Sequence, residues 1–218
     1  MPRSPKTPAR AGDAPPRSRA AWGTISREQV VQAAVRTVRA GGYEQMTIRS
    51  LAAELGVAPM SLYRHVRDKD DILDAVVDRL LVQVWRPRVS AEDWRSWVAE
   101  AADRLRDFLV TQPAALHVYL RHPVVSPAAL ARYEEMLRVL RQSGADERGV
   151  RSAYAAIHTH TIGFAALEAS RARWAGAELA EPADAITAEL AAFATPRQFA
   201  EGVRYLLEGI QGRTEAKR

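Results

Sequence analysis

Residues 48–67 read IRSLAAELGVAPMSLYRHVR and decide how the N-terminal part of the chain folds. Two short helical patterns meet at Gly56, which tolerates the positive φ found where a helix ends. Ala52 lies four residues earlier and is small enough to let the second helix cross closely at a steep angle. The segment therefore predicts a helix-turn-helix, whose second helix enters the DNA major groove. An ordinary corner between two helices is the alternative that this spacing alone leaves open.

The outward face of the second helix favours the helix-turn-helix. Leu62 and Val66 mark its buried side, and the side chains left facing outward are Pro59, Met60, Ser61, Tyr63, Arg64 and His65. Such side chains donate to phosphates, read base edges or touch thymine methyl groups. Arg49 projects beside them from the first helix of this motif, and Lys69 begins the helix that follows the motif, the fourth of the chain. For the tyrosine, the alternative is an aromatic ring packed into the core.

Capping residues set the helix boundaries on either side of this segment. The expected starts of four helices are Ser26, Thr47, Pro59 and Asp68. Ser26 with Gln29 three residues later is a capping box. Pro59 suits the first turn of a helix, because it lacks the N–H group that would have no hydrogen-bond partner there. The first helix is expected to end at Gly41-Gly42 and the third to run through Val66.

Beyond Arg86-Pro87-Arg88, the expected boundary between two domains, the helical pattern continues. Further helices are expected to begin at Ser90 with Asp93, Pro113, Ser126-Pro127, Asp146, Glu181-Pro182 and Thr195-Pro196. We find no alternating strand pattern and no internal repeat in the sequence. We therefore predict an all-α fold of nine or ten helices, with an N-terminal three-helix helix-turn-helix domain, a linking helix and a C-terminal helical domain.

The composition is that of a globular protein with a basic arm. The chain has 218 residues, of which 47% are hydrophobic and 26% charged, enough to bury a core. Residues 1–23 contain five prolines and no aliphatic periodicity, so we expect a disordered arm there. The expected domains are this arm, a helix-turn-helix domain over residues 24–86 and a second domain over residues 87–218.

The net charge of +5 belongs to the N-terminal end. Residues 1–23 hold five basic residues and one acidic residue, residues 24–86 hold nine and eight, and residues 87–218 hold seventeen of each. A basic end on a neutral body indicates an anionic partner at that end. A basic tail without a role is the alternative.

The sequence also indicates in which cellular compartment the protein is expected. Cysteine is absent, which excludes disulfides, thiolate metal sites and cysteine nucleophiles. Polar residues interrupt the longest uncharged stretch, residues 152–167, so we expect no membrane span. No apolar segment follows the N-terminal arginines, so we expect no secretory signal and a cytoplasmic protein.

The region from Ser26 to Leu81 resembles the DNA-binding domain of the tetracycline repressor family. The motifs that carry the resemblance are LAAELGV, SLYRHVRDKDDIL and the preceding GGYEQMTIR. The rest of the chain resembles the all-helical effector-binding and dimerisation domain of that family more loosely, and FAEGVRYLLEGI resembles its final helix. The resemblance implies a homodimeric repressor that leaves a palindromic double-stranded operator when a small molecule binds.

The resemblance also implies roles for residues of the helix-turn-helix. Tyr63, His65 and Lys69 would bind phosphates, with Thr47 assisting near the first helix, and Arg49 would contact a guanine edge. The residues that would set the remaining sequence preference are Pro59, Met60, Ser61 and Arg64.

Two helices are expected to form the dimer interface. A stripe of small side chains lets another helix approach closely and comprises Ser152, Ala156, Thr159, Gly163 and Ala166. The last helix offers an apolar face formed by Phe199, Val203, Leu206 and Ile210. In the resembling family these helices pair with their copies as a four-helix bundle. Packing inside one subunit is the alternative.

The effector pocket is expected within the C-terminal domain. Bulky apolar side chains with a few hydrogen-bonding groups are typical of such cavities, and the candidates are Phe108, His117, Tyr133, Met136, His158, Thr161 and Phe164. The same residues would suit a plain helical core. His158 and His160 are two residues apart and point to different sides of a helix, so we predict no metal site and no cofactor.

The sequence does not indicate an enzyme. It lacks G-x-S-x-G, a phosphate-binding Gly-Lys loop, H-E-x-x-H and a Glu-x-x-His pair. A helical adaptor, or a ligand-binding protein without operator function, would not need the basic outward face described above. We therefore predict a ligand-responsive DNA-binding transcriptional repressor.

Overall fold

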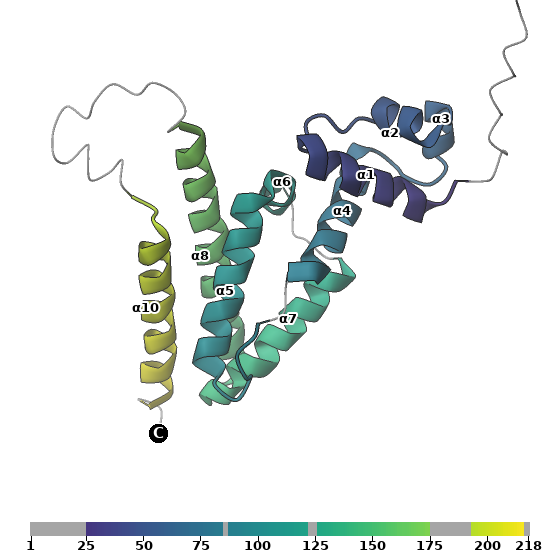
Figure 1. Ribbon diagram of the computed structural model, residues 1–218. Helices are drawn as coiled ribbons and strands as arrows, with labels where there is room; N and C mark the ends of the chain where they lie inside the picture. Colours follow the sequence, from purple (N-terminus) through teal and green to yellow (C-terminus); the bar gives the residue numbers. More distant parts are fainter. Residues whose placement is uncertain (1–24, 85–86, 122–125, 175–192, 216–218) are drawn as a thin grey trace, which may run out of the picture.

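The computed structural model describes residues 25–84, 87–121, 126–174 and 193–215 (Figure 1). Within these ranges the secondary structure consists of α-helices and one short 3-10 helix, and contains no strand. The predicted all-α fold is confirmed. The arm before residue 24, the joint at Arg86 and the helix expected at Glu181-Pro182 lie outside the described residues.

The N-terminal helices match the order expected from the sequence. They are α1 (Arg27–Gly41), α2 (Ile48–Leu55), α3 (Pro59–Leu62) and α4 (Lys69–Val84). The later elements are α5 (Trp94–Thr111), α6 (Pro113–Arg121), α7 (Pro127–Leu140), η1 (Arg141–Ser143), α8 (Glu147–Trp174) and α10 (Pro196–Glu215). Helix α4 leads from the helix-turn-helix toward α7, and α10 lies beside α8 at the opposite end of the molecule (Figure 1).

Local hydrogen bonds explain where several helices begin and end. The Ser26 hydroxyl accepts from the Gln29 N–H at 3.2 Å, and the Gln29 side chain accepts from the Ser26 N–H at 2.8 Å, which confirms the predicted capping box. Gly56 has φ 68° and ends α2 in the left-handed region, while the Val57 N–H donates to the Ala52 carbonyl. The tight turn between α2 and α3 therefore depends on a glycine.

Helix α3 is shorter than predicted. It ends at Leu62 and the chain continues as a turn through His65, whereas the sequence predicts helix through Val66. The Leu62 carbonyl accepts from the N–H groups of both His65 and Val66, so the turn after α3 keeps helix-like hydrogen bonds. The His65 carbonyl accepts from the Arg27 side chain instead of from a following turn of helix. A contact with a distant residue thus holds the turn that follows α3.

Helix α5 also begins later than the Ser90 position. Asp93 is its N-cap and accepts from the Ser96 N–H at 3.2 Å, while the Ser90 hydroxyl accepts from the Glu92 N–H in the preceding loop. Thus Asp93 alone caps the helix.

Two clusters of buried side chains form the core. The first joins α1, α2, α3 and α4 to parts of α5 and α6, and includes Leu51, Leu62, Ile72 and Leu109. The second joins α5, α7, α8 and α10. Because the first cluster continues from the N-terminal helices into α5 and α6, the N-terminal domain does not have a core of its own.

No helix within the described ranges is both long enough and apolar enough to span a lipid bilayer.

Candidate DNA-binding surface and ligand-binding region

The outward face of α3 and of the turn that follows it has the composition that the sequence periodicity predicts. Leu62 and Val66 are buried, while Met60 is 73% exposed and Tyr63 is 49% exposed. Pro59 and Arg64 are also exposed, and Ser61 and His65 are half-buried. Tyr63 is therefore a surface side chain, and the alternative of a ring packed in the core does not hold.

Thr47 and Arg49 lie at the start of α2. Both are exposed, and the Thr47 hydroxyl accepts from the Ser50 N–H at 2.9 Å as part of a capping box. The cap fixes the first turn of α2 and with it the position from which Arg49 projects.

A charged clamp holds the end of α3 against α1 and α4. The Arg27 guanidinium donates to both Asp71 carboxylate oxygens at 2.8 Å and to the His65 carbonyl at 2.9 Å. Asp71 also accepts from the Arg67 N–H at 3.0 Å. Bidentate pairing of this kind fixes geometry as well as charge. Sequence spacing does not predict this clamp, because Arg27 and Asp71 are 44 residues apart.

The clamp lowers the pKa of Asp71 to about 2, chiefly through the hydrogen bonds from Arg27. The unfolded chain has an aspartate pKa near 3.9, so it takes up the proton first as the pH falls. The ionised pair thus stabilises the fold fully above about pH 5, and this stabilisation is lost as the pH falls from about 4 toward 2.

Asp71→Asn is expected to reduce the free energy of unfolding by about 2 kcal/mol at pH 7. Urea unfolding at a fixed protein concentration, between pH 7 and pH 3, would measure the difference from wild type, which should shrink below pH 4. Glu201→Gln, which alters an exposed pair with Arg197, is the matched control and should have little effect. A difference that stays constant down to pH 3 would contradict the assignment to the Asp71 carboxylate.

The predicted pocket residues lie in different surroundings. Phe108, Met136, Thr161 and Phe164 are buried. Phe108 belongs to the first core cluster, whereas Met136 and Phe164 belong to the second. The Thr161 hydroxyl donates to the Ile157 carbonyl at 2.7 Å. His117 lies apart from these residues, with its ring stacked on Tyr43 of the N-terminal domain.

Polar and aromatic side chains gather around His158. Its ring stacks on Tyr154 at 5.1 Å between centroids, and Nδ1 lies 3.4 Å from a guanidinium nitrogen of Arg132. Tyr133 packs edge-on against Tyr154. Burial, followed by the charge of Arg132, lowers the pKa of His158 to about 4, so its imidazole is neutral at physiological pH.

Two neighbours of His158 complete this cluster. The Tyr119 ring lies 6.1 Å from His158 between centroids. Burial raises the pKa of the Tyr119 hydroxyl, and the neighbouring Arg132 opposes that rise. Arg132 and Tyr154 are not among the predicted pocket residues. Arg132 lies three residues after Ala129 and four before Met136, so helical spacing already placed it on the buried face of α7.

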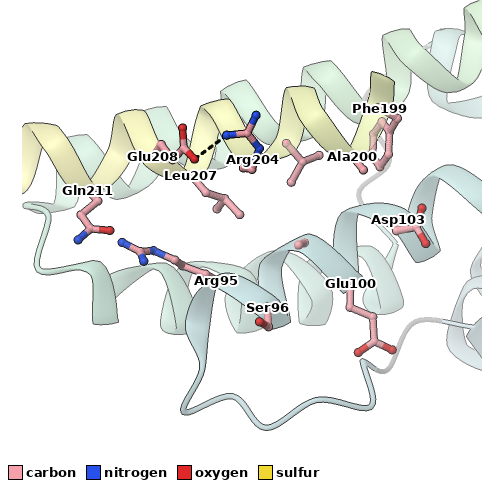
Figure 2. A pocket seen from close by; sticks show the side chains of 12 residues that line it. Arg95, Ser96, Glu100, Asp103, Phe199, Ala200, Arg204, Leu207, Glu208 and Gln211 are labelled. Atoms are coloured by element: carbon pink, nitrogen blue, oxygen red, sulfur yellow. Dashed lines mark hydrogen bonds and ion pairs between the residues drawn. The ribbon is translucent and has the colours of Figure 1, made fainter. Parts of the chain in front are cut away.

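An open groove of about 500 Å³ runs between α5 and α10 (Figure 2). Arg95, Ser96, Glu100 and Asp103 line it from α5. Across it, Arg204 of α10 pairs with Glu208 of the same helix at 2.8 Å. None of the predicted pocket residues lines this groove.

The expected dimer helices differ in what they expose. On α8 the small-residue stripe is open: Ser152, Ala156, Thr159 and Gly163 are exposed, and Ala166 is half-buried. A β-carbon added at Gly163 would meet no atom within 4 Å. Among the residues that the structure describes, none covers this stripe at its exposed positions.

The prediction for the last helix needs a correction. Phe199 and Val203 are buried within the chain, where Phe199 stacks on His160 at 5.3 Å between centroids. They face α5 and α8 of their own subunit, because α10 needs an apolar face to dock there. Leu206 and Ile210 are half-buried. Tyr205, which the sequence analysis did not select, is 61% exposed.

The histidines of α8 diverge as their spacing predicts. His158 contacts Arg132 and Tyr154, whereas His160 contacts Phe199. Across the described ranges, no three His, Asp or Glu side chains are grouped so that they could hold a metal ion.

Comparison with known proteins covers both parts of the chain. Residues 30–76 match the family model described as "Bacterial regulatory proteins, tetR family", and residues 86–214 match "Tetracyclin repressor-like, C-terminal domain". An HTH-type transcriptional regulator of Saccharopolyspora erythraea is 33% identical over 144 residues, which are 66% of this chain and 61% of that protein. The HTH-type transcriptional repressor DrrR1 of Streptomyces coeruleorubidus is 33% identical over 147 residues, which are 65% of this chain and 53% of that protein.

Among solved structures, ActR of Streptomyces coelicolor without ligand has a TM-score of 0.73 at 22% identity, over 91% of this chain and 100% of ActR. ActR in complex with actinorhodin is similar to this chain with a TM-score of 0.72 at 21% identity, over 87% and 98%. These likenesses concern the fold. The two family models together cover the helix-turn-helix, the core and the helices that follow it, and so this chain belongs to the tetR family of bacterial regulatory proteins.

Proposed function

We propose that the chain is a ligand-responsive DNA-binding repressor that acts as a homodimer on a palindromic operator. The observation that carries the proposal is the outward face of α3 and of the turn that follows it, where Met60, Tyr63 and Arg64 are exposed beside a buried Leu62. A helix with this face, held by the Arg27–Asp71 clamp, suits insertion into a major groove. The names of the two relatives, a transcriptional regulator and a transcriptional repressor, support the same function.

Contacts with DNA divide between positioning and reading. Tyr63, His65 and Lys69 would bind phosphates, with Thr47 assisting beside them. Arg49 would contact a guanine edge, where its planar guanidinium can donate twice. The residues that would set the rest of the sequence preference are Pro59, Met60, Ser61 and Arg64.

The dimer would form through α8 and α10 of two copies. The exposed small side chains of α8 support this, because they allow a second helix to approach closely. Two copies related by a two-fold axis would present two α3 helices to successive major grooves, about 34 Å apart.

The effector would bind among α6, α7 and α8 around His158, Tyr133 and Tyr119. The buried hydroxyl of Tyr119 and the neutral imidazole of His158 support this site, because both offer hydrogen bonds inside an aromatic surrounding. Phe108, Met136, Thr161 and Phe164 would form its apolar boundary. Ligand binding would then shift the population of inter-domain arrangements through α4 and separate the two α3 helices from their grooves.

The domain division follows the same proposal. Residues 24–86 would bind DNA, residues 87–218 would bind the effector and the second copy, and the basic arm at residues 1–23 would add contacts with phosphates. No enzymatic step, cofactor or membrane is part of this function, and its compartment would be the cytoplasm.

Selection of bound duplexes from random DNA, followed by titration of the selected duplex at several salt concentrations, tests the proposal. The expected result is a palindrome bound by two chains, at least 10³-fold tighter than scrambled DNA of the same length. Weak binding without sequence preference would contradict operator function and would favour an adaptor or a ligand-binding protein.

A further inference from the structure

Three consecutive residues at the start of α4 contact three different parts of the protein. Asp71 binds Arg27 and so holds the end of α3. Asp70 forms an ion pair with Arg121 of α6. The Lys69 ammonium lies 5.9 Å from the centre of the Tyr43 ring, in the loop between α1 and α2. The first turn of α4 is therefore a junction between the DNA-binding surface and the C-terminal domain.

Helix α6 reaches this junction with two side chains. His117 and Arg121 are four residues apart and so lie one above the other on the same side of the helix. His117 stacks on Tyr43 with 5.1 Å between ring centroids and 28° between ring planes, and Arg121 binds Asp70. Helix α6 lies next to the N-terminal helices, as these contacts require (Figure 1).

Tyr43 connects the two sets of contacts. Its half-buried ring packs against the first core cluster, so its position depends on its neighbours. One of these neighbours is the His117 ring, and another is the Lys69 ammonium, which is attracted to the negative face of an aromatic ring. A ring held by His117 thus limits the directions that the long Lys69 side chain can take.

We propose that His117 and Arg121 form a latch between the domains and act as positioning residues for DNA binding. The latch holds the first turn of α4 through Asp70, and through Tyr43 it holds the Lys69 ammonium where it binds an operator phosphate. This inference rests on the proposed contact between Lys69 and DNA. It makes two side chains of the C-terminal domain determinants of operator affinity, although neither belongs to the DNA-binding surface.

Two variants and a control measure the effect of the latch. In full-length protein, His117→Ala is expected to weaken binding of the selected duplex by about fivefold, the order expected when stacking that orients a phosphate-binding group is lost. His117→Phe keeps a ring against Tyr43 and should restore most of the affinity. Leu120→Ala is the matched control, because its side chain is on α6 but is 59% exposed, and it should bind DNA as wild type does.

A double-mutant cycle separates positioning from a general loss of stability. Lys69→Ala alone should weaken binding and reduce the slope of log affinity against log salt by about two for a dimer. In the Lys69→Ala background, His117→Ala should have no further effect, because the group that it positions is absent. Arg121→Gln, which removes the charge bound to Asp70, should follow the same pattern.

The outcomes are distinct. If His117→Ala weakens binding equally with and without Lys69, the latch does not act through Lys69 and the inference is wrong. If Lys69→Ala weakens binding but His117→Ala does not, the inference fails while the proposed phosphate contact stands. If Lys69→Ala changes neither the affinity nor the salt slope, the phosphate contact itself fails and the latch fails with it. Thermal unfolding of each variant shows that the compared proteins are folded.

Discussion

Gly163→Arg is expected to convert the protein into a monomer and to weaken its binding to the selected palindrome by about 10²- to 10⁴-fold, the loss typical when two linked half-sites are bound independently. Gly163 lies in the middle of the exposed small-residue stripe of α8. An arginine there would prevent a second helix from approaching closely. Sedimentation velocity would measure the oligomeric state, and a duplex titration would measure the affinity.

The same substitution leaves the single chain intact, which makes the test specific. A β-carbon at Gly163 meets no atom within 4 Å, and arginine has a higher helix propensity than glycine. Ala172→Arg is the matched control, because it is exposed on α8 nine residues later and therefore on the opposite side of the helix. A Gly163→Arg protein that remains dimeric would contradict the proposed interface.

The double substitution Tyr63→Ala and Lys69→Ala is expected to weaken operator binding by about 10³-fold. A dimer would lose four phosphate contacts at about 1 kcal/mol each, or about 4 kcal/mol in total. Loss of two ammonium groups would also reduce the salt slope by about two. Fluorescence anisotropy with the selected duplex, at three or more salt concentrations, would measure both quantities.

The double variant should remain folded, because Tyr63 is half exposed and Lys69 is only partly buried. Its thermal unfolding should be within a few degrees of wild type. Arg197→Ala removes one positive charge from the exposed start of α10 and should leave DNA binding unchanged. For an adaptor without operator function, the wild type, the double variant and the Arg197→Ala control would all bind DNA with the same low affinity.

The sequence predicts the helix boundaries well where a boundary depends on neighbouring residues. The capping box at Ser26, the cap at Thr47 and the glycine turn at Gly56 involve hydrogen bonds within five residues, so residue types at fixed spacings suffice to find them. The sequence predicts helix through Val66, whereas the structure has a turn after Leu62 whose His65 carbonyl binds Arg27, 38 residues earlier. Sequence spacing carries no signal for a contact at that separation.

Which side chains of a helix face the solvent and which face the core could also be predicted from the sequence. Which other helix the buried face packs against could not. Periodicity separates Leu62 and Val66 from the exposed residues of α3, and the structure confirms this division. On α10, periodicity identifies Phe199 and Val203 as an apolar face and cannot say whether that face meets α8 of the same chain or a second copy. For the same reason, the sequence alone suggests His117 as a pocket residue and cannot show that its ring stacks on Tyr43.

The continuous first core also bears on how regulators of this kind can be recombined. Its buried residues extend from Val30 in α1 to Leu109 in α5 and Ala115 in α6. In a hybrid that joins residues 24–86 to the second domain of a different protein, the shared core would therefore contain side chains from two proteins whose shapes do not match. The exposed face of α3 and Arg49 take almost no part in that shared interior. If they read the operator as proposed, exchanging them alone would change operator specificity without disturbing the core.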